Sequence, residues 1–520
     1  MNSQYDQAVW KRLLDYYGRA TPWSRQLWRL STPLEIDELL EAGKARHSAT
    51  LSDGSIKYLM QSLAERVKRD VGIGDLKQRG TLVGHLAKGL TPEGHNVYAI
   101  QLLAEQARAN YLERWAAEAR KGKISSEVVS RAVGSYLLDI GFSQDALHKW
   151  WTYHGRHSPK AAGIADLIEE AATLSRRPKI CFDILVPITS TPPLPDQRDP
   201  AWLDSTAAAG WLSYWFPGEL HPRQTGALLV EIEARDVYSA VEQVAEVVTR
   251  LTARFRVGTR QKLVFHDELF VVGEEKSWPY IQAPRRVEVH ALHRTSAIFD
   301  LNLSQDINAA LELLEPLDSG TPAAAIAGSW AAIEALFVGP GDTNERVVAA
   351  TRMARIVACS YVRAELTALA NGYAISFDDS LAGRLRALNA NFEKALAFEG
   401  EIRSGNSITF KRTRHKLALD RMTALIAKPE NILPKIVGQL EDSFRRLYRQ
   451  RNLVVHAGDL TSVALRGTLR TVAPLVGAGI DRIVHASAVG KKSPIELSAI
   501  AEVNLASVGE DGKRLVLLLS

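Results

Sequence analysis

The sequence has little of what marks a secreted, metal-cluster or nucleotide-binding protein. Only two of its 520 residues are cysteines, Cys181 and Cys359, and each lies in an apolar run far from the other. This pair argues against a disulfide framework and a cysteine-based zinc site, and it is typical of buried thiols in a reducing compartment. No glycine-rich phosphate loop follows any expected strand, so a nucleotide-binding fold is not favoured. We expect no cofactor.

The sequence also lacks a segment suited to a membrane. Residues 1–20 carry several charged side chains and no apolar core, unlike a signal peptide. The most apolar run, 321–339, is short and contains Glu334. With 46% hydrophobic and 24% charged residues, the chain is expected to be a cytoplasmic globular protein that does not bind membranes. Its net charge of +5 permits an anionic partner without demanding one.

The spacing of apolar residues predicts a mainly α protein with an α+β middle domain and a C-terminal helical bundle. A helical N-terminal region is expected over 1–178 and a small α+β domain over 179–300. Helices return over 301–490, and a C-terminal tail follows over 491–520. The run Arg514–Leu519 in this tail has strand character and could add an edge strand to the middle domain.

Three of the histidines of the middle domain, His266, His290 and His293, lie near one another in the sequence, where strands are expected over 262–272 and 285–293. His290 and His293 are three residues apart, so in a strand they would face opposite sides of the sheet. His266 alone does not make a metal site, and no cysteine or metalloprotease pattern adds ligands. We therefore expect no metal site here.

The strongest chemical signal lies at the end of the helix expected over 432–456. Its apolar stripe recurs at helical spacing through Leu447, and the next position on that stripe is Arg451. A cation on a core-facing stripe is costly unless it is paired or has a function. Asn452 and His456, four residues apart, share a face of this helix. The result is a small polar group in an apolar frame.

These three residue types suit the cleavage of RNA without a metal ion. Histidine titrates near neutral pH and serves as a base or an acid. Arginine stabilises charge that develops on a phosphate, and the RNA 2′-hydroxyl supplies an internal nucleophile. Asn452 could orient His456 or donate a hydrogen bond to the phosphate. The structural alternative is that His456 and Gly458 merely end the helix, but this leaves Arg451 unexplained.

The stretch Tyr448–Gly458 resembles the signature of HEPN domains, in which an arginine precedes a histidine by four to six residues and is commonly followed by a polar residue. It is most similar to the ApeA-like HEPN branch of bacterial defence proteins. Residues 328–337, followed by 344–358 with Arg352 and Arg355, are similar to the first two helices of that branch. The resemblance covers roughly 320–480.

The resemblance implies a HEPN helical bundle that forms a homodimer and brings two Arg/His motifs into one cleft. It further implies a metal-independent endoribonuclease that leaves a 2′,3′-cyclic phosphate. Such an enzyme would be the toxic effector of a bacterial anti-phage, abortive-infection or toxin system, with an antitoxin or a phage-derived trigger as a possible partner. Glu334 matches an acidic position of the family and could pair with Arg451 or Arg352.

The motif leaves the identity of the catalytic arginine open. The family pattern selects Arg451, whereas an ideal helix places Arg449 on the face of Asn452 and His456. A break in the helix near Val454 would reconcile the two assignments. Arg445 and Arg446 are expected, with Arg449, on a solvated basic face, where they could guide RNA.

Two other functions compete with the nuclease. One is a non-catalytic HEPN adaptor that binds RNA or a protein partner. The other is a DNA-binding regulator that uses the aromatic and basic segment 149–157, in which Trp150 and Trp151 lie between Lys149 and Arg156. Large aromatic side chains usually pack in cores, so we expect these tryptophans to pack between helices.

Overall fold

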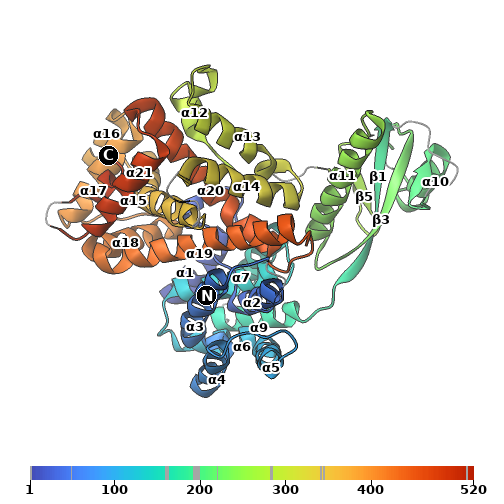
Figure 1. The fold of residues 1–520 in the computed structure, drawn as a ribbon, viewed down its shortest axis with the longest axis horizontal. Coiled ribbons are helices and arrows are strands. Elements are labelled where there is room, and N and C mark those ends of the chain that lie inside the picture. Colours follow the sequence, from blue (N-terminus) through green and yellow to red (C-terminus); the bar gives the residue numbers. More distant parts are fainter. Residues whose placement is uncertain are drawn as a thin grey trace.

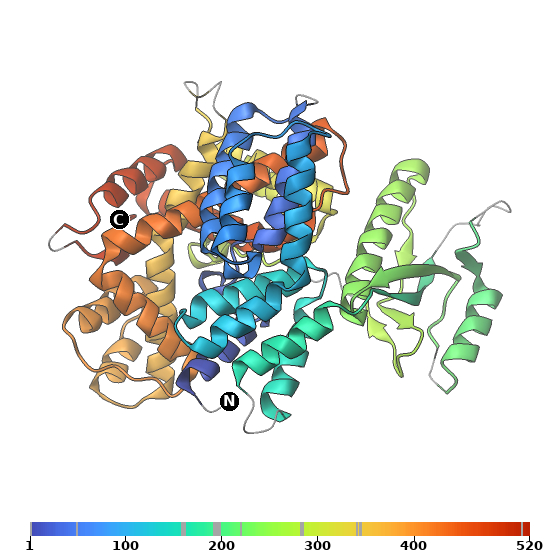
Figure 2. The same ribbon diagram turned by 90° about the horizontal axis from the view of Figure 1, so that it is seen from below.

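A computed structural model gives the fold, and it is mostly helical with a small sheet in the middle of the chain (Figure 1). This confirms the expected mainly α architecture with an α+β middle. Figures 1 and 2 both show the sheet projecting from two helical parts that pack side by side. The structure describes residues 3–47, 50–157, 163–190, 199–218, 221–280, 285–339, 342, 346–510 and 513–520.

The N-terminal helices surround a hydrophobic core that includes the fully buried Trp115 and Trp151. Serine side chains such as Ser52 and Ser125 cap these helices by accepting a hydrogen bond from a first-turn backbone N–H. Leu453, from far along the chain, belongs to the same core. The elements are α1 (Gln4–Tyr17), η1 (Trp23–Arg25), α2 (Thr32–His47), α3 (Asp53–Arg69), η2 (Val71–Ile73), α4 (Leu76–Leu86), α5 (His95–Ala109), α6 (Tyr111–Lys121), α7 (Ser126–Asp139), α8 (Gln144–His157) and α9 (Ile164–Ser175).

The middle part is an antiparallel sheet in the order β2-β3-β1-β5-β6, with β4 also pairing with β1. Side chains alternate along β1, so Ile184 packs in the core shared with α11 and Leu185 packs in the core shared with α10. Helices therefore cover both faces of the sheet. The elements are β1 (Ile180–Ser190), β2 (Trp202–Asp204), α10 (Ser205–Trp215), β3 (Gly226–Ala234), α11 (Val237–Thr259), β4 (Val264–Phe265), β5 (Glu268–Val271) and β6 (Trp278–Pro279).

The C-terminal helices pack around α15, which contacts α17, α19, α20 and α21. By length and composition α20 could cross a membrane, and 67% of its most apolar window is buried inside the structure. The elements are α12 (His290–Arg294), η3 (Ala297–Phe299), α13 (Gln305–Ser319), α14 (Pro322–Phe337), α15 (Val348–Ser376), α16 (Ser380–Ala387), α17 (Asn391–Arg403), α18 (Thr413–Ala427), α19 (Pro429–His456), α20 (Leu465–Gly490), α21 (Pro494–Ala506) and η4 (Leu515–Leu517).

Two expected strands are absent from the residues that the structure describes. The segment expected as a strand over 285–293 instead runs into the short helix α12. The tail forms η4 and packs against α15 and α17, away from the sheet. The backbone N–H groups of Leu515 and Val516 donate to the buried Glu399 carboxylate, at 3.0 and 3.2 Å. A short apolar run has no period that separates a strand from a buried turn, so the prediction was wrong.

A half-buried histidine on α20 predicts a pH effect on stability. Burial, followed by the cations Arg482, Arg363 and Arg294, lowers the pKa of His485 to about 4. Below pH about 6.5 the unfolded chain binds a proton here that the folded chain rejects, so this residue destabilises the fold as the pH falls towards 4. We expect His485→Gln to lose less of its urea midpoint than the wild type between pH 7 and pH 5. An equal loss in both proteins would refute this assignment.

Candidate functional site

The candidate site lies at the end of α19, on the surface of the molecule. Gly458 follows the helix with φ 67°, and the backbone N–H of Asp459 donates to the carbonyl oxygen of Leu453 at 3.1 Å. This is the hydrogen-bond pattern of a glycine-terminated helix. The burial of Asn452 and Leu453 fixes the helix, while the neighbouring His456 is exposed. The site therefore combines a buried, well-packed helix end with an accessible histidine.

The structure brings Arg451, Asn452 and His456 together. The Nη1 atom of Arg451 donates to His456 Nε2 at 2.7 Å and to Asn452 Oδ1 at 3.1 Å. A guanidinium group can only donate, so His456 Nε2 is the acceptor in this contact. Asn452 thus positions the arginine, rather than the histidine as the sequence suggested.

The helix reaches this arrangement without a break. It is continuous to His456, so the expected break near Val454 does not occur. On an ideal helix Arg451 and His456 lie about 140° apart. The long arginine side chain covers this angle, since its guanidinium group reaches the histidine. Predicting contacts from backbone angles alone ignored the length of the side chain.

The competing arginine is not at the site. Arg449 is only 3% exposed and donates to Glu38 on α2, with distances of 2.9 Å from Nε and 2.7 Å from Nη2. Burial opposes ionisation of Glu38, but Arg449 and Arg446 lower its pKa overall. A guanidinium group held in this way cannot contact a substrate. The geometric preference for Arg449 is therefore wrong in this structure.

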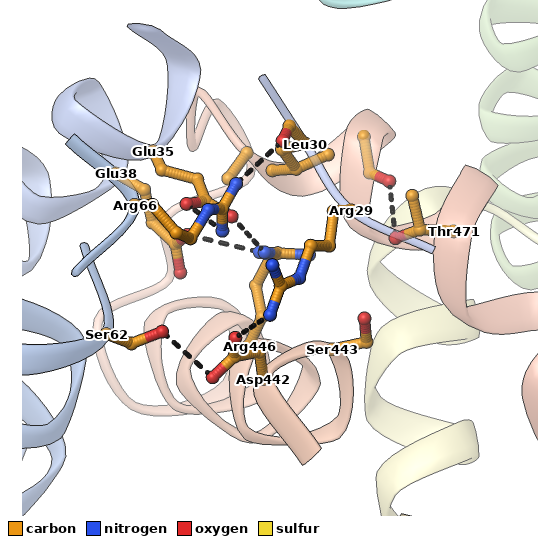
Figure 3. A network of polar contacts seen from close by, with 12 residues as sticks. Arg29, Leu30, Glu35, Glu38, Ser62, Arg66, Asp442, Ser443, Arg446 and Thr471 are labelled. Carbon is orange, nitrogen blue, oxygen red and sulfur yellow. Dashed lines mark hydrogen bonds and ion pairs between the residues drawn. The ribbon is translucent and has the colours of Figure 1, made fainter. Parts of the chain in front are cut away.

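The expected solvated basic face is also wrong. Arg446 is 1% exposed and is held by Glu35 at 2.6 Å and Glu38 at 3.2 Å (Figure 3). Arg445 is partly buried, pairs with Glu441 at 2.7 Å and lies over the Tyr58 ring. Neither arginine presents a free cation to RNA. Among the described residues, Arg451 is the one arginine of this helix end that has no carboxylate partner.

Figure 3 shows polar contacts that join the N-terminal helices to α19, the helix that carries the motif. Asp442 on α19 accepts hydrogen bonds from Arg29, Tyr58 and Ser62, at 2.9, 2.8 and 3.0 Å. Arg66 on α3 pairs with Glu35, which also binds Arg446. The buried carboxylates Glu35 and Glu38 were missed from the sequence because acidic residues on a helix normally mark its solvent face.

Glu41, on α2, contacts the loop that follows α19. Its carboxylate accepts hydrogen bonds from Ser462 Oγ at 2.5 Å and from the backbone N–H of Val463 at 3.1 Å. Glu41 therefore fixes the loop next to His456. We expect Glu41→Gln to weaken this anchor, because charge-assisted hydrogen bonds are roughly twice as strong as neutral ones.

Hydrogen exchange measures this effect directly. Amide exchange over 457–464 is expected to become about tenfold faster in Glu41→Gln, the factor that 1.4 kcal/mol of local stability represents. The exposed Glu105 on α5 provides the control, since Glu105→Gln leaves the loop untouched. Equal protection in the wild type and in Glu41→Gln would show that Glu41 does not hold the loop.

Glu334 does not pair with Arg451 or Arg352, and that expectation is wrong. Its carboxylate lies 3.8 Å from Arg346, while Arg352 pairs with Asp342. Asp342 therefore occupies the arginine that Glu334 was expected to bind. Helix α14 instead contacts α19 through the rings of Trp330 and Tyr448, whose centroids lie 4.9 Å apart. Glu334 thus has a structural role in the helical bundle.

The other candidate segments serve mainly as structure. Trp151 is fully buried and Trp150 packs against the N-terminal core, in keeping with the packing role expected for both. His290 is exposed and contacts Glu288, on a helix rather than on the expected strand. Within the part of the chain that the structure describes, no group of three or more histidine, cysteine, aspartate or glutamate residues could hold a metal ion.

Comparisons of this chain with protein-family models, with curated proteins and with solved structures found no match. The resemblance to HEPN domains thus rests on the motif residues and their order in the sequence. The geometry adds an exposed histidine in contact with an arginine that has no carboxylate partner among the described residues. A function can be proposed from these two groups.

Proposed function

We propose that this protein is a metal-independent endoribonuclease of the HEPN type, whose C-terminal bundle acts as the toxic effector of a bacterial anti-phage or toxin system. One observation carries the proposal. The Arg451 guanidinium group lacks a carboxylate partner among the described residues and lies 2.7 Å from Nε2 of the exposed His456. The neighbouring Arg445, Arg446 and Arg449 all have such partners. A cation left available beside a base suits a phosphate substrate.

The chemistry follows from this contact. When an RNA phosphate draws the Arg451 guanidinium group away, His456 Nε2 becomes free to take the proton of the 2′-hydroxyl. The 2′ oxygen then bonds to phosphorus and the bond from phosphorus to the 5′ oxygen breaks. A protonated histidine donates a proton to the leaving oxygen, and the product carries a 2′,3′-cyclic phosphate. Arg451 stabilises the negative charge on the phosphate in the transition state.

The surface around His456 supports the pairing of two copies of the chain. Val455, Leu460 and Val463 are 48%, 55% and 48% exposed beside the motif. A cluster of exposed apolar side chains next to a polar site is typical of an interaction surface. In the proposed dimer, one His456 acts as the base and the other acts as the acid, so neither copy is complete alone.

The remainder of the chain would restrain or trigger the effector. The N-terminal helices contact α19 through Glu35 and Glu38 and the loop after it through Glu41, so a change in their position would reach the site directly. A phage-derived trigger or an antitoxin would act on this contact.

The test is incubation of the purified full-length protein with RNA in EDTA. Cleavage by the wild type that is lost in both Arg451→Ala and His456→Ala supports the nuclease. Identical behaviour of the three proteins would refute it.

A non-catalytic adaptor is the second candidate, and the same contact favours it. In a single chain Arg451 and His456 satisfy each other, so the pair could simply shape a surface that binds RNA or a protein. This function predicts RNA binding that survives His456→Ala and yields no cleavage product.

A further inference from the structure

A second polar site lies where the three parts of the chain meet. A cavity of about 420 Å³ opens between the α7–α8 turn, the β3–α11 region, the segment Arg285–Arg286 and α20. We call it the junction cavity. Its volume falls in the range of small-molecule sites, about 300–1,000 Å³. It shares no residue with the Arg451/His456 site.

Positive charge predominates in the lining of the junction cavity. Six cationic side chains face four acidic ones. Arg466 and Arg470 are neutralised by Glu246 and Asp139, at 2.8 and 2.5 Å. The cationic residues are Lys179, Arg235, Arg285, Arg286, Arg466 and Arg470.

Three of these arginines have no carboxylate partner among the described residues. Arg285 donates to the carbonyl oxygens of Leu317 and Gly320, at 3.1 and 2.9 Å. Arg235 likewise donates only to backbone carbonyl oxygens. Arg286 makes the weakest contacts, all at 3.4 Å. Carbonyl oxygens accept hydrogen bonds from these guanidinium groups but carry no net negative charge, so the positive charge of three residues that line the cavity is not paired with a bound carboxylate.

The backbone at Arg286 also has an uncommon conformation, which Glu93, Arg260, Ser296 and Lys491 share outside the cavity. Its φ is 63°, in the left-handed region that non-glycine residues rarely adopt. Strained backbone of this kind is found at functional sites. Burial also lowers the pKa of both Arg285 and Arg286, against the opposing effect of Glu246 and Asp318 on Arg285 and of Glu288 and Asp145 on Arg286.

The acidic residues of the junction cavity carry less negative charge than their number suggests. Burial of the carboxyl group, followed by the carboxylates of Asp236 and Asp145, raises the pKa of Glu242 to about 7. Arg19 and Arg466 oppose this shift. Near neutral pH Glu242 therefore carries only part of its negative charge, and the cavity is correspondingly more positive.

We propose that the junction cavity binds a small anionic ligand that carries phosphate groups, with Arg285 and Arg286 as the recognising residues and Arg235 in support. Such a ligand would contact the N-terminal helices, the sheet domain and α20 at once. It would stabilise the folded arrangement of all three, since a ligand that binds only the folded state adds to its stability.

The test uses inorganic pyrophosphate as the probe on the full-length protein, by calorimetry at pH 8 and constant ionic strength. We expect saturable binding and a rise in melting temperature. Arg286→Gln should weaken binding about tenfold, since it removes a charge-assisted contact. Glu242→Gln should tighten binding, because it removes a negative charge from the cavity. The control is Arg254→Gln, an exposed arginine of α11 outside the cavity, which should not alter binding.

Two results would overturn the proposal. One is the absence of binding at millimolar pyrophosphate. The other is an affinity that Arg286→Gln and Arg254→Gln lower equally, which would place the anion elsewhere on the surface. The opposite signs expected for Arg286→Gln and Glu242→Gln keep the test decisive even if one variant folds poorly.

Discussion

Replacement of His456 by alanine is expected to lower the rate of RNA cleavage by roughly 10²–10⁴-fold, the usual contribution of a positioned acid or base. The histidine is exposed and its ring contacts Arg451, so the urea midpoint should stay unchanged. Initial rates on a labelled RNA in EDTA measure the effect. A folded His456→Ala protein that cleaves at the wild-type rate would remove His456 from the mechanism.

The control for this prediction is a second exposed histidine. His290 contacts Glu288 at the surface, far from the motif in the sequence. We expect His290→Ala to retain full activity. A loss in His290→Ala as large as that in His456→Ala would mean that the assay reports general damage rather than chemistry.

Replacement of Glu38 by alanine is expected to destabilise the folded protein by about 3–5 kcal/mol, the typical cost of removing one partner from a buried ion pair. Glu38 binds both Arg446 and Arg449, and Arg449 has no other carboxylate among the described residues. The variant leaves the Arg449 charge buried without compensation. The urea midpoint of the full-length protein measures the loss.

A double variant separates charge from packing. Glu38→Met with Arg449→Met removes both members of the pair and should recover part of the stability, since apolar residues of similar volume often replace buried ion pairs well. The surface pair Glu65–Lys68 provides the control, and Glu65→Ala should leave the midpoint unchanged. A Glu38→Ala midpoint equal to that of Glu65→Ala would show that the buried network does not hold α19.

The sequence predicted those features of the site that depend on local patterns. The apolar period placed a helix over 432–456, where α19 runs from Pro429 to His456. Arg451, Asn452 and His456 lie within one turn and a half of each other, and the structure brings them into contact.

The features that depend on distant partners could not be predicted in this way. Nothing near Arg446 or Arg449 in the sequence indicates that their carboxylates come from α2, about 400 residues earlier. Arginines at helical spacing look the same whether solvent or a buried glutamate faces them. The strand predicted in the tail was wrong for a related reason. The conformation of the tail depends on the buried Glu399, which accepts hydrogen bonds from Leu515 and Val516.

The chemistry of the RNA ends tests the central proposal most directly. Wild-type protein should cleave RNA in EDTA to leave a 2′,3′-cyclic phosphate on one fragment and a 5′-hydroxyl on the other, and Arg451→Ala and His456→Ala should not. Fragments with a 3′-hydroxyl and a 5′-phosphate, or the same products from His456→Ala, would contradict it.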